Sequence, residues 1–148
     1  MLAVPPALWR LRRLILLLAF AGVLALLYSV GAHGIMTLND FKSIEGDQRM
    51  GIASLPVQLG VQRAALAACL AMALPQFVVV GLLLHWQAPM HAGIVALLLA
   101  LQLLMMRRFL SAPRTHATWY SANGVLLYVL GMLCSAFALR AMIDGGAA

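Results

Sequence analysis

Four long stretches without a charged residue dominate the sequence and restrict the folds open to it. They cover residues 14–36, 64–84, 92–106 and 121–139. A helix needs about 20 mainly apolar residues to cross the hydrocarbon core of a bilayer. Lipid offers no hydrogen-bond partners, so each span must pair its own backbone amides, and the alternation of period two that barrel strands require is missing. The sequence predicts an all-α bundle of about four transmembrane helices, forming a single domain over residues 1–148.

The composition excludes a water-soluble domain. Of the 148 residues, 64% are hydrophobic and only 9% are charged, against roughly 45–50% and about 25% in ordinary soluble domains. The net charge of +6 would suit a nucleic-acid partner, but the basic residues are scattered over the connecting segments rather than gathered in a stripe. We therefore expect membrane lipid, and no nucleic acid, around this chain.

The basic residues also predict how the spans are oriented. Cytoplasmic loops of membrane proteins carry an excess of Lys and Arg. The segment between the second and third spans has neither, so we expect it on the non-cytoplasmic side, and the two loops on the other side to be cytoplasmic. The N-terminal arginines conflict with this orientation, which would be explained if further helices preceded the first span. The cytoplasmic loops carry Lys42, Arg49 and Arg63 in one case and Arg107, Arg108 and Arg114 in the other, and the conflicting residues are Arg10, Arg12 and Arg13.

The chemistry of the chain is concentrated in the loop predicted over residues 37–63. Three of the four acidic residues lie there, namely Asp40, Glu45 and Asp47. Ionisable groups at the end of a membrane span are costly and mark a functional site by default. Clustered carboxylates repel one another unless a cation lies between them, and Mg²⁺ binds one or two carboxylates together with phosphate oxygens of a substrate. The loop therefore suits a site for Mg²⁺ and a diphosphate.

Helical spacing suggests how the side chains of this segment divide. If the first span continues as a helix, Asp40, Ser43 and Asp47 share one face, while Lys42 and Arg49 share another. A glycine at position 46 makes an unbroken helix uncertain. Lys42 and Arg49 would then hold the outer phosphate oxygens of a leaving diphosphate.

Three other interpretations compete with this one. The loop is equally compatible with a solvated segment in which Asp40 or Glu45 pairs with Lys42 or Arg49. The chain as a whole would then be a structural membrane subunit or an inactive fragment, held together by helix packing. A small transporter is less favoured, because the acids lie at a span end and not in mid-membrane.

Two segments of this loop resemble a known family. Residues 34–47, Gly-Ile-Met-Thr-Leu-Asn-Asp-Phe-Lys-Ser-Ile-Glu-Gly-Asp, and residues 51–60, Gly-Ile-Ala-Ser-Leu-Pro-Val-Gln-Leu-Gly, are similar to the second acidic motif of UbiA-type prenyltransferases. Within that family they most resemble the chlorophyll and bacteriochlorophyll synthase branch. The later Met-Met-Arg-Arg-Phe-Leu string at 105–110 also looks like the end of such a synthase.

The resemblance implies a fold, an activity and a set of roles. The fold would be the C-terminal part of a nine-helix membrane bundle, in a bacterial inner or photosynthetic membrane with the motif loop on the cytoplasmic side. The activity would be Mg²⁺-dependent transfer of a geranylgeranyl or phytyl group from its diphosphate to bacteriochlorophyllide. Asp40 and Asp47 would be catalytic and would bind the metal with Glu45; Lys42 and Arg49 would contact the diphosphate, with Asn39 as a supporting polar group.

The sequence departs from the family pattern in two respects. Many family members have a carboxylate four residues before the position of Asp47, where this chain has Ser43, a difference that the synthase branch shares. The first acidic motif, of the Asn-Asp-x-x-Asp kind, is not found in residues 1–148. We therefore expect the chain to act with an N-terminal half that supplies this motif.

Two further groups of residues have a mainly structural interpretation. Aromatic and imidazole side chains near span ends would reach a pigment, but they more often anchor helices at the membrane interface or form ordinary hydrogen bonds. Both cysteines lie in apolar runs and are expected to be packing residues. The first group is Tyr28, His33, His116, Trp119 and Tyr120, and the cysteines are Cys69 and Cys134.

Overall fold

The computed structural model describes residues 6–144, which form six α-helices. Four are long: α1 (Pro6–Asp40), α4 (Val61–His85), α5 (Pro89–Ser111) and α6 (Pro113–Asp144). Two short helices, α2 (Ile44–Met50) and α3 (Leu55–Leu59), lie between α1 and α4. The described residues contain no strand, so the predicted all-α class is confirmed.

The long helices extend beyond the predicted spans at both ends. The shortest prediction, 92–106, lies within a helix of 23 residues that includes Arg107 and Arg108. Charged side chains can reach water from the end of a span while their backbone stays helical. The length of a charge-free stretch therefore underestimates the length of its helix. The starts of α5 and α6 coincide with Pro89 and Pro113, because proline suits the first turn of a helix.

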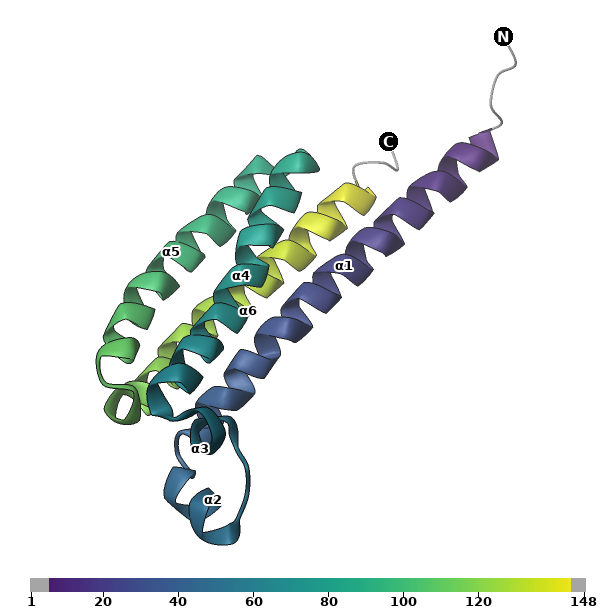
Figure 1. Ribbon diagram of the computed structural model, residues 1–148. Coiled ribbons are helices and arrows are strands. Elements are labelled where there is room, and N and C mark those ends of the chain that lie inside the picture. The colour runs from purple at the N-terminus through teal and green to yellow at the C-terminus, as the bar shows by residue number, and fades with distance from the viewer. Residues whose placement is uncertain (1–5, 145–148) are drawn as a thin grey trace.

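The four long helices form an antiparallel bundle in which α4 is the most enclosed (Figure 1). It packs against α1 and α5, and α6 contacts both α5 and α1. Four of the ten buried residues of α4 are alanines, including Ala64, Ala65 and Ala68. Because small residues let helix backbones approach closely in a membrane, these alanines explain the tight packing of α1 on α4.

Some of the glycines in the long helices allow close contacts with neighbouring groups. A Cβ on Gly34 of α1 would lie 2.6 Å from the carbonyl oxygen of Ala68 in α4. Gly31 is likewise packed against the ring of Tyr128 in α6, whereas Gly124 is packed against the ring of Tyr120 in its own helix. Gly22 and Gly81, by contrast, have open space around them within the described residues.

The outer surface of the bundle is apolar. All four long helices have the length and hydropathy needed to cross a membrane. Large aliphatic side chains project from them, with Leu16, Leu26, Leu97 and Leu104 each more than half exposed. Since exposed apolar surface of this extent is not tolerated in water, the chain is an integral membrane protein.

A chain of polar side chains crosses the interior of the bundle. Nε2 of Gln76 donates to Oε1 of Gln102 at 2.7 Å, and Nε2 of Gln102 donates to the hydroxyl of Tyr120 at 3.3 Å. All three residues are fully buried. Oε1 of Gln76 has no hydrogen-bond partner among the described residues. It faces Gly131, where a Cβ would lie 3.2 Å away. This network links α4, α5 and α6, and its glutamines were not predicted from the sequence.

The two ends of the bundle differ in character. The short helices α2 and α3 lie at the same end as the corner between α5 and α6, whereas the α4–α5 turn lies at the other end with the start of α1 and the end of α6 (Figure 1). The N-terminal basic residues therefore stand at the end predicted to be non-cytoplasmic. Arg13 has a local partner there, because its Nη2 donates to the carbonyl oxygen of Met142 at 2.7 Å. A cation suits the C-terminal end of a helix, where carbonyl groups are unpaired.

Candidate functional site at the end of α1

The acidic segment is a helix–turn–helix at the end of α1. The first helix ends at Asp40, and α2 begins at Ile44. The amide of Lys42 donates to the carbonyl of Asn39, and that of Ser43 to the carbonyl of Asp40, each at 3.1 Å. The helix is therefore interrupted at residues 41–43 and not at Gly46, which lies within α2.

Glycine ends this short helix. Gly51 follows Met50 with φ of 69°, a left-handed conformation that glycine adopts without strain and that commonly ends a helix. Its amide donates to the carbonyls of Asp47 and Gln48. The chain then turns toward α3, where the hydroxyl of Ser54 is buried without a partner in the described residues.

Ser43 fixes the carboxylate of Asp47. Its hydroxyl lies 3.1 Å from Oδ2 of Asp47 and 3.3 Å from the carbonyl oxygen of Asp40. Asp47 is only 7% exposed. The predicted common face of Ser43 and Asp47 is thus confirmed, although the helix that carries them is α2 and its preceding turn rather than an extension of α1.

Aromatic rings pack the acidic segment against the bundle. Phe41, in the interrupting turn, packs edge-on against Phe109 of α5 with ring centroids 5.6 Å apart. Phe109 in turn stacks on Tyr120 of α6 at 5.0 Å. All three rings are buried. These three packed rings hold the acidic segment beside the corner between α5 and α6.

A polar cavity of about 560 Å³ lies between the segment and that corner. Three cationic side chains line it, Lys42 and Arg49 from the segment and Arg114 from the start of α6. Its one acidic lining residue is Glu45. The net positive lining suits an anion with several oxygens. From the sequence, Arg114 was interpreted only as a marker of orientation.

The predicted site residues fall into two groups. Lys42, Arg49 and Glu45 line the polar cavity, whereas Asp40 and Asp47 do not. Asn39 is exposed at the end of α1, and Asp40 is half-buried. Within residues 6–144 no three His, Cys, Asp or Glu side chains lie close enough together to hold a metal ion.

The carboxylates of this segment provide only part of the ligands that Mg²⁺ needs. The structure does not bring Asp40, Glu45 and Asp47 together. Ser43 links the two aspartates, since its hydroxyl contacts the backbone of one and the carboxylate of the other. Mg²⁺ needs only one or two carboxylates when phosphate oxygens and water complete its octahedron. Asp40 and Asp47 stay predicted ligands for such an ion.

The competing ion-pair interpretation is not supported. The one salt bridge in the described part of the chain joins Arg140 and Asp144 at the opposite end of α6. The carboxylates of Asp40 and Glu45 make none with Lys42 or Arg49.

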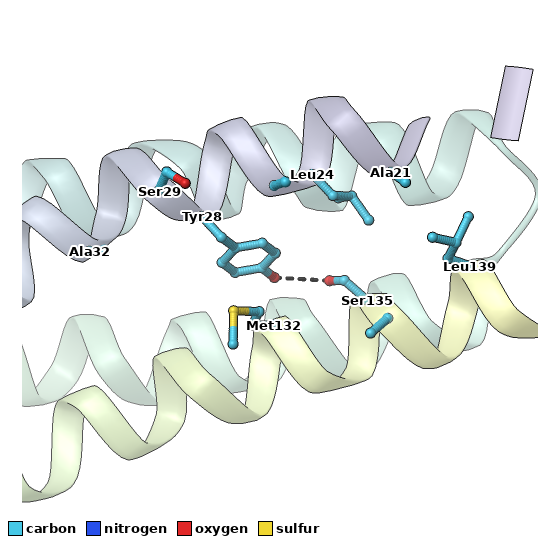
Figure 2. Close-up of a pocket in the computed structure, with 10 residues that line it drawn as sticks. Ala21, Leu24, Tyr28, Ser29, Ala32, Met132, Ser135 and Leu139 are labelled. Atoms are coloured by element: carbon cyan, nitrogen blue, oxygen red, sulfur yellow. Dashed lines mark hydrogen bonds between the residues drawn. The ribbon is translucent and has the colours of Figure 1, made fainter. Parts of the chain in front are cut away.

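A second, apolar cavity of about 460 Å³ lies between α1 and α6 (Figure 2). Its lining is almost entirely aliphatic, with Leu24 and Ala32 on one side and Met132 and Leu139 on the other. The polar side chains of its lining are Tyr28, Ser29 and Ser135. The hydroxyls of Tyr28 and Ser135 are hydrogen-bonded to each other at 2.9 Å (Figure 2). A cavity of this kind suits a hydrocarbon chain.

The residues considered for pigment contact mostly have structural partners. Tyr28 and Tyr120 are buried inside the bundle with hydrogen bonds to Ser135 and Gln102. Trp119 lies under the guanidinium of Arg108, 4.7 Å from its ring centroid. Nδ1 of His116 is 2.8 Å from the carbonyl oxygen of Arg108, and the carbonyl of His33 accepts from Thr37.

Comparison with curated proteins places the chain in a family. Residues 3–130 match the UbiA prenyltransferase family. The bacteriochlorophyll synthase 33 kDa chain of Cereibacter sphaeroides is 53% identical over 123 residues, which is 83% of this chain and 41% of that protein. The bacteriochlorophyll synthase 34 kDa chain of Chloroflexus aurantiacus is 50% identical over 118 residues, or 80% of this chain and 38% of that protein.

A plant protein is related more distantly. The chloroplastic chlorophyll synthase of Arabidopsis thaliana is 38% identical over 117 residues, covering 78% of this chain and 30% of that protein. No solved structure matches the chain. The chain thus spans about two fifths or less of the length of these relatives. Because the family match extends over most of its length, the chain belongs to the UbiA prenyltransferase family.

Proposed function

We propose that this chain provides one part of the active site of a prenyltransferase that esterifies bacteriochlorophyllide with a geranylgeranyl or phytyl group. The donor is the corresponding prenyl diphosphate. The observation that carries this proposal is the cation-lined cavity beside the buried Asp47, in a chain 53% identical to part of a bacteriochlorophyll synthase.

The leaving diphosphate would be held by Lys42 and Arg49. During transfer the pigment carboxylate attacks the first carbon of the prenyl chain, the C–O bond to the diphosphate breaks, and the diphosphate carries away the electron pair. Cations placed where negative charge develops stabilise such a transition state. Lys42 and Arg49 both line the polar cavity, so both can contact phosphate oxygens there.

Asp40 and Asp47 are the proposed metal ligands. Mg²⁺ bound there would neutralise charge on the diphosphate as it leaves. The role of Ser43 is to orient the Asp47 carboxylate through its 3.1 Å hydrogen bond. Glu45, expected from the resemblance to join them, instead lines the cation-rich cavity, where it would limit the positive charge.

The prenyl tail would lie in the apolar cavity between α1 and α6. That cavity begins at Ala32 and continues away from the motif to Ala21 along the same helix. A prenyl chain that runs along α1 from a diphosphate held beyond Asp40 would enter this cavity at Ala32. Enclosing the tail in this way keeps water from the reacting carbon, which prevents hydrolysis of the donor.

We place the motif on the cytoplasmic side of a bacterial photosynthetic membrane. The end with α2 and α3 also carries Arg63, Arg107 and Arg108, as the excess of positive residues in cytoplasmic loops requires. In a variant lacking Cys69 and Cys134, Gln48→Cys should react with an impermeant maleimide from the cytoplasmic side. Met90→Cys should react from the opposite side, and the reverse pattern would contradict the orientation.

A chimera tests the proposed activity. The C-terminal part of the Cereibacter sphaeroides relative that matches this chain is replaced by this chain, and esterification of bacteriochlorophyllide by geranylgeranyl diphosphate is measured with and without Mg²⁺. The chain alone is assayed in parallel. We expect Mg²⁺-dependent ester formation by the chimera, abolished by Asp47→Asn and unaffected by Asp144→Asn.

The outcomes separate the enzyme from an inactive membrane subunit. A chimera that reaches the membrane in normal amounts but forms no ester would contradict the proposal. Equal activity of the chimera and its Asp47→Asn variant would remove Asp47 from the mechanism.

A further inference from the structure

The corner between α5 and α6 contributes a cation to the polar cavity from a distant part of the sequence. Arg114 is the second residue of α6, and its side chain lines the cavity opposite the acidic segment. None of the roles implied by the family resemblance falls on this residue. Its position raises the question of what it binds.

Hydrogen bonds hold this corner in place. Nε2 of Gln62, at the start of α4, donates to the carbonyl oxygen of Leu110 at 2.9 Å. Nδ1 of His116 lies 2.8 Å from the carbonyl oxygen of Arg108, and the hydroxyl of Ser111 donates to the same oxygen at 2.7 Å. The backbone that carries Arg114 is therefore fixed relative to α4 and α5.

The cations around the cavity have no anionic partner within residues 6–144. Arg140, by comparison, has a carboxylate 3.6 Å away in Asp144, and Arg108 is engaged by the ring of Trp119. Lys42, Arg49 and Arg114 converge on one space with only Glu45 among them. Convergence of like charges raises the energy of the empty site, and a bound anion removes that cost.

We propose that Arg114 completes a three-cation cradle with Lys42 and Arg49 that binds the diphosphate of the prenyl donor. This inference rests on the proposed function for the identity of the ligand. The guanidinium presents several donors in a planar fork, which pairs with two phosphate oxygens at once. Lys42 and Arg49 approach the ligand from the segment that follows α1, and Arg114 approaches from α6. The diphosphate thereby bridges two elements that are far apart in the sequence.

Binding of inorganic pyrophosphate to the full 148-residue chain in lipid nanodiscs tests the cradle without requiring catalysis. Arg114→Gln should raise the dissociation constant by about tenfold, because a charge-assisted contact is lost. The dissociation constant of Arg114→Lys should lie between those of Arg114→Gln and the unchanged chain, since lysine keeps the charge but lacks the planar fork of donors. Arg140→Gln, a change at an exposed arginine at the far end of the same helix, should bind pyrophosphate as the unchanged chain does.

Further measurements distinguish a loss of pyrophosphate binding from misfolding and from a failure of the proposed activity. Arg114 is exposed, so its substitution should leave helix content and thermal unfolding unchanged. In the chimera, Arg114→Gln should raise the KM for geranylgeranyl diphosphate and leave the KM for the pigment unaltered. Unchanged pyrophosphate affinity in Arg114→Gln, or no pyrophosphate binding by the unchanged chain, would overturn the cradle. Binding that weakens in Arg114→Gln, in a chain whose chimera transfers no prenyl group, would instead leave the cradle standing and refute the proposed activity.

Discussion

The hydroxyl of Ser43 lies 3.1 Å from Oδ2 of the buried Asp47, so a neutral side chain fixes the acid that the site depends on. Ser43→Ala should lower kcat/KM of the chimera by about tenfold, because a hydrogen bond to a charged group is lost. Ser43→Thr retains the hydroxyl and should keep most of the activity. Steady-state rates at saturating Mg²⁺ measure the effect, and equal rates for the alanine and threonine variants would contradict it.

Glu45 lines the polar cavity and Asp47 does not, which predicts unequal effects of neutralising the two acids. Asp47→Asn should reduce kcat by about 100-fold or more, the size expected when a group that stabilises developing charge is removed. Glu45→Gln should change kcat less than about tenfold, because Glu45 lines the cation-rich cavity and neither aspartate does. Rates measured over a Mg²⁺ titration decide between this ranking and a site in which all three acids bind metal. Equal losses in the two variants would favour the three-acid site.

Packing of α1 on α4 predicts a steric effect at Gly34. A Cβ there would lie 2.6 Å from a backbone oxygen of Ala68, and a backbone atom in a packed helix cannot move aside easily. Gly34→Ala should therefore destabilise the protein by about 1–3 kcal/mol. Gly22→Ala, in the same helix but with open space around it, is the matched control and should be neutral or slightly stabilising. Thermal unfolding in detergent measures both, and equal destabilisation would contradict the packing.

The buried amide pair predicts an energetic coupling between α4 and α5. Nε2 of Gln76 and Oε1 of Gln102 are 2.7 Å apart. Gln76→Met and Gln102→Met should each destabilise the bundle, and the double variant should lose less than the sum. The expected coupling is about 0.6–1.7 kcal/mol, the range for hydrogen bonds between membrane helices. Unfolding free energies in a double-mutant cycle give the value, and coupling of zero would show that the pair contributes nothing.

Several features of the protein could be predicted from the sequence because they depend on neighbouring residues. Apolar length sets which segments cross a membrane, and four charge-free stretches became four long helices. The i, i+4 spacing of Ser43 and Asp47 placed them on one face, and their hydrogen bond confirms it. The site as a whole stays a prediction, since the roles of Asn39, Lys42 and Arg49 depend on a ligand.

The remaining features depend on contacts between distant segments. The interruption at residues 41–43 accompanies the packing of Phe41 on Phe109 of α5. Glu45 was grouped with two aspartates because the three are close in sequence, yet it lines a cavity with Arg114. Neither result follows from local spacing.

By itself, then, the sequence determined that this chain is a membrane bundle with three of its four acidic residues in one connecting segment, since hydrophobic length and charge order are properties of the chain alone. Only the tertiary structure decided which charges face one another. The direction in which a short helix points is set by the rings and helix ends it packs against, and those partners lie far along the chain.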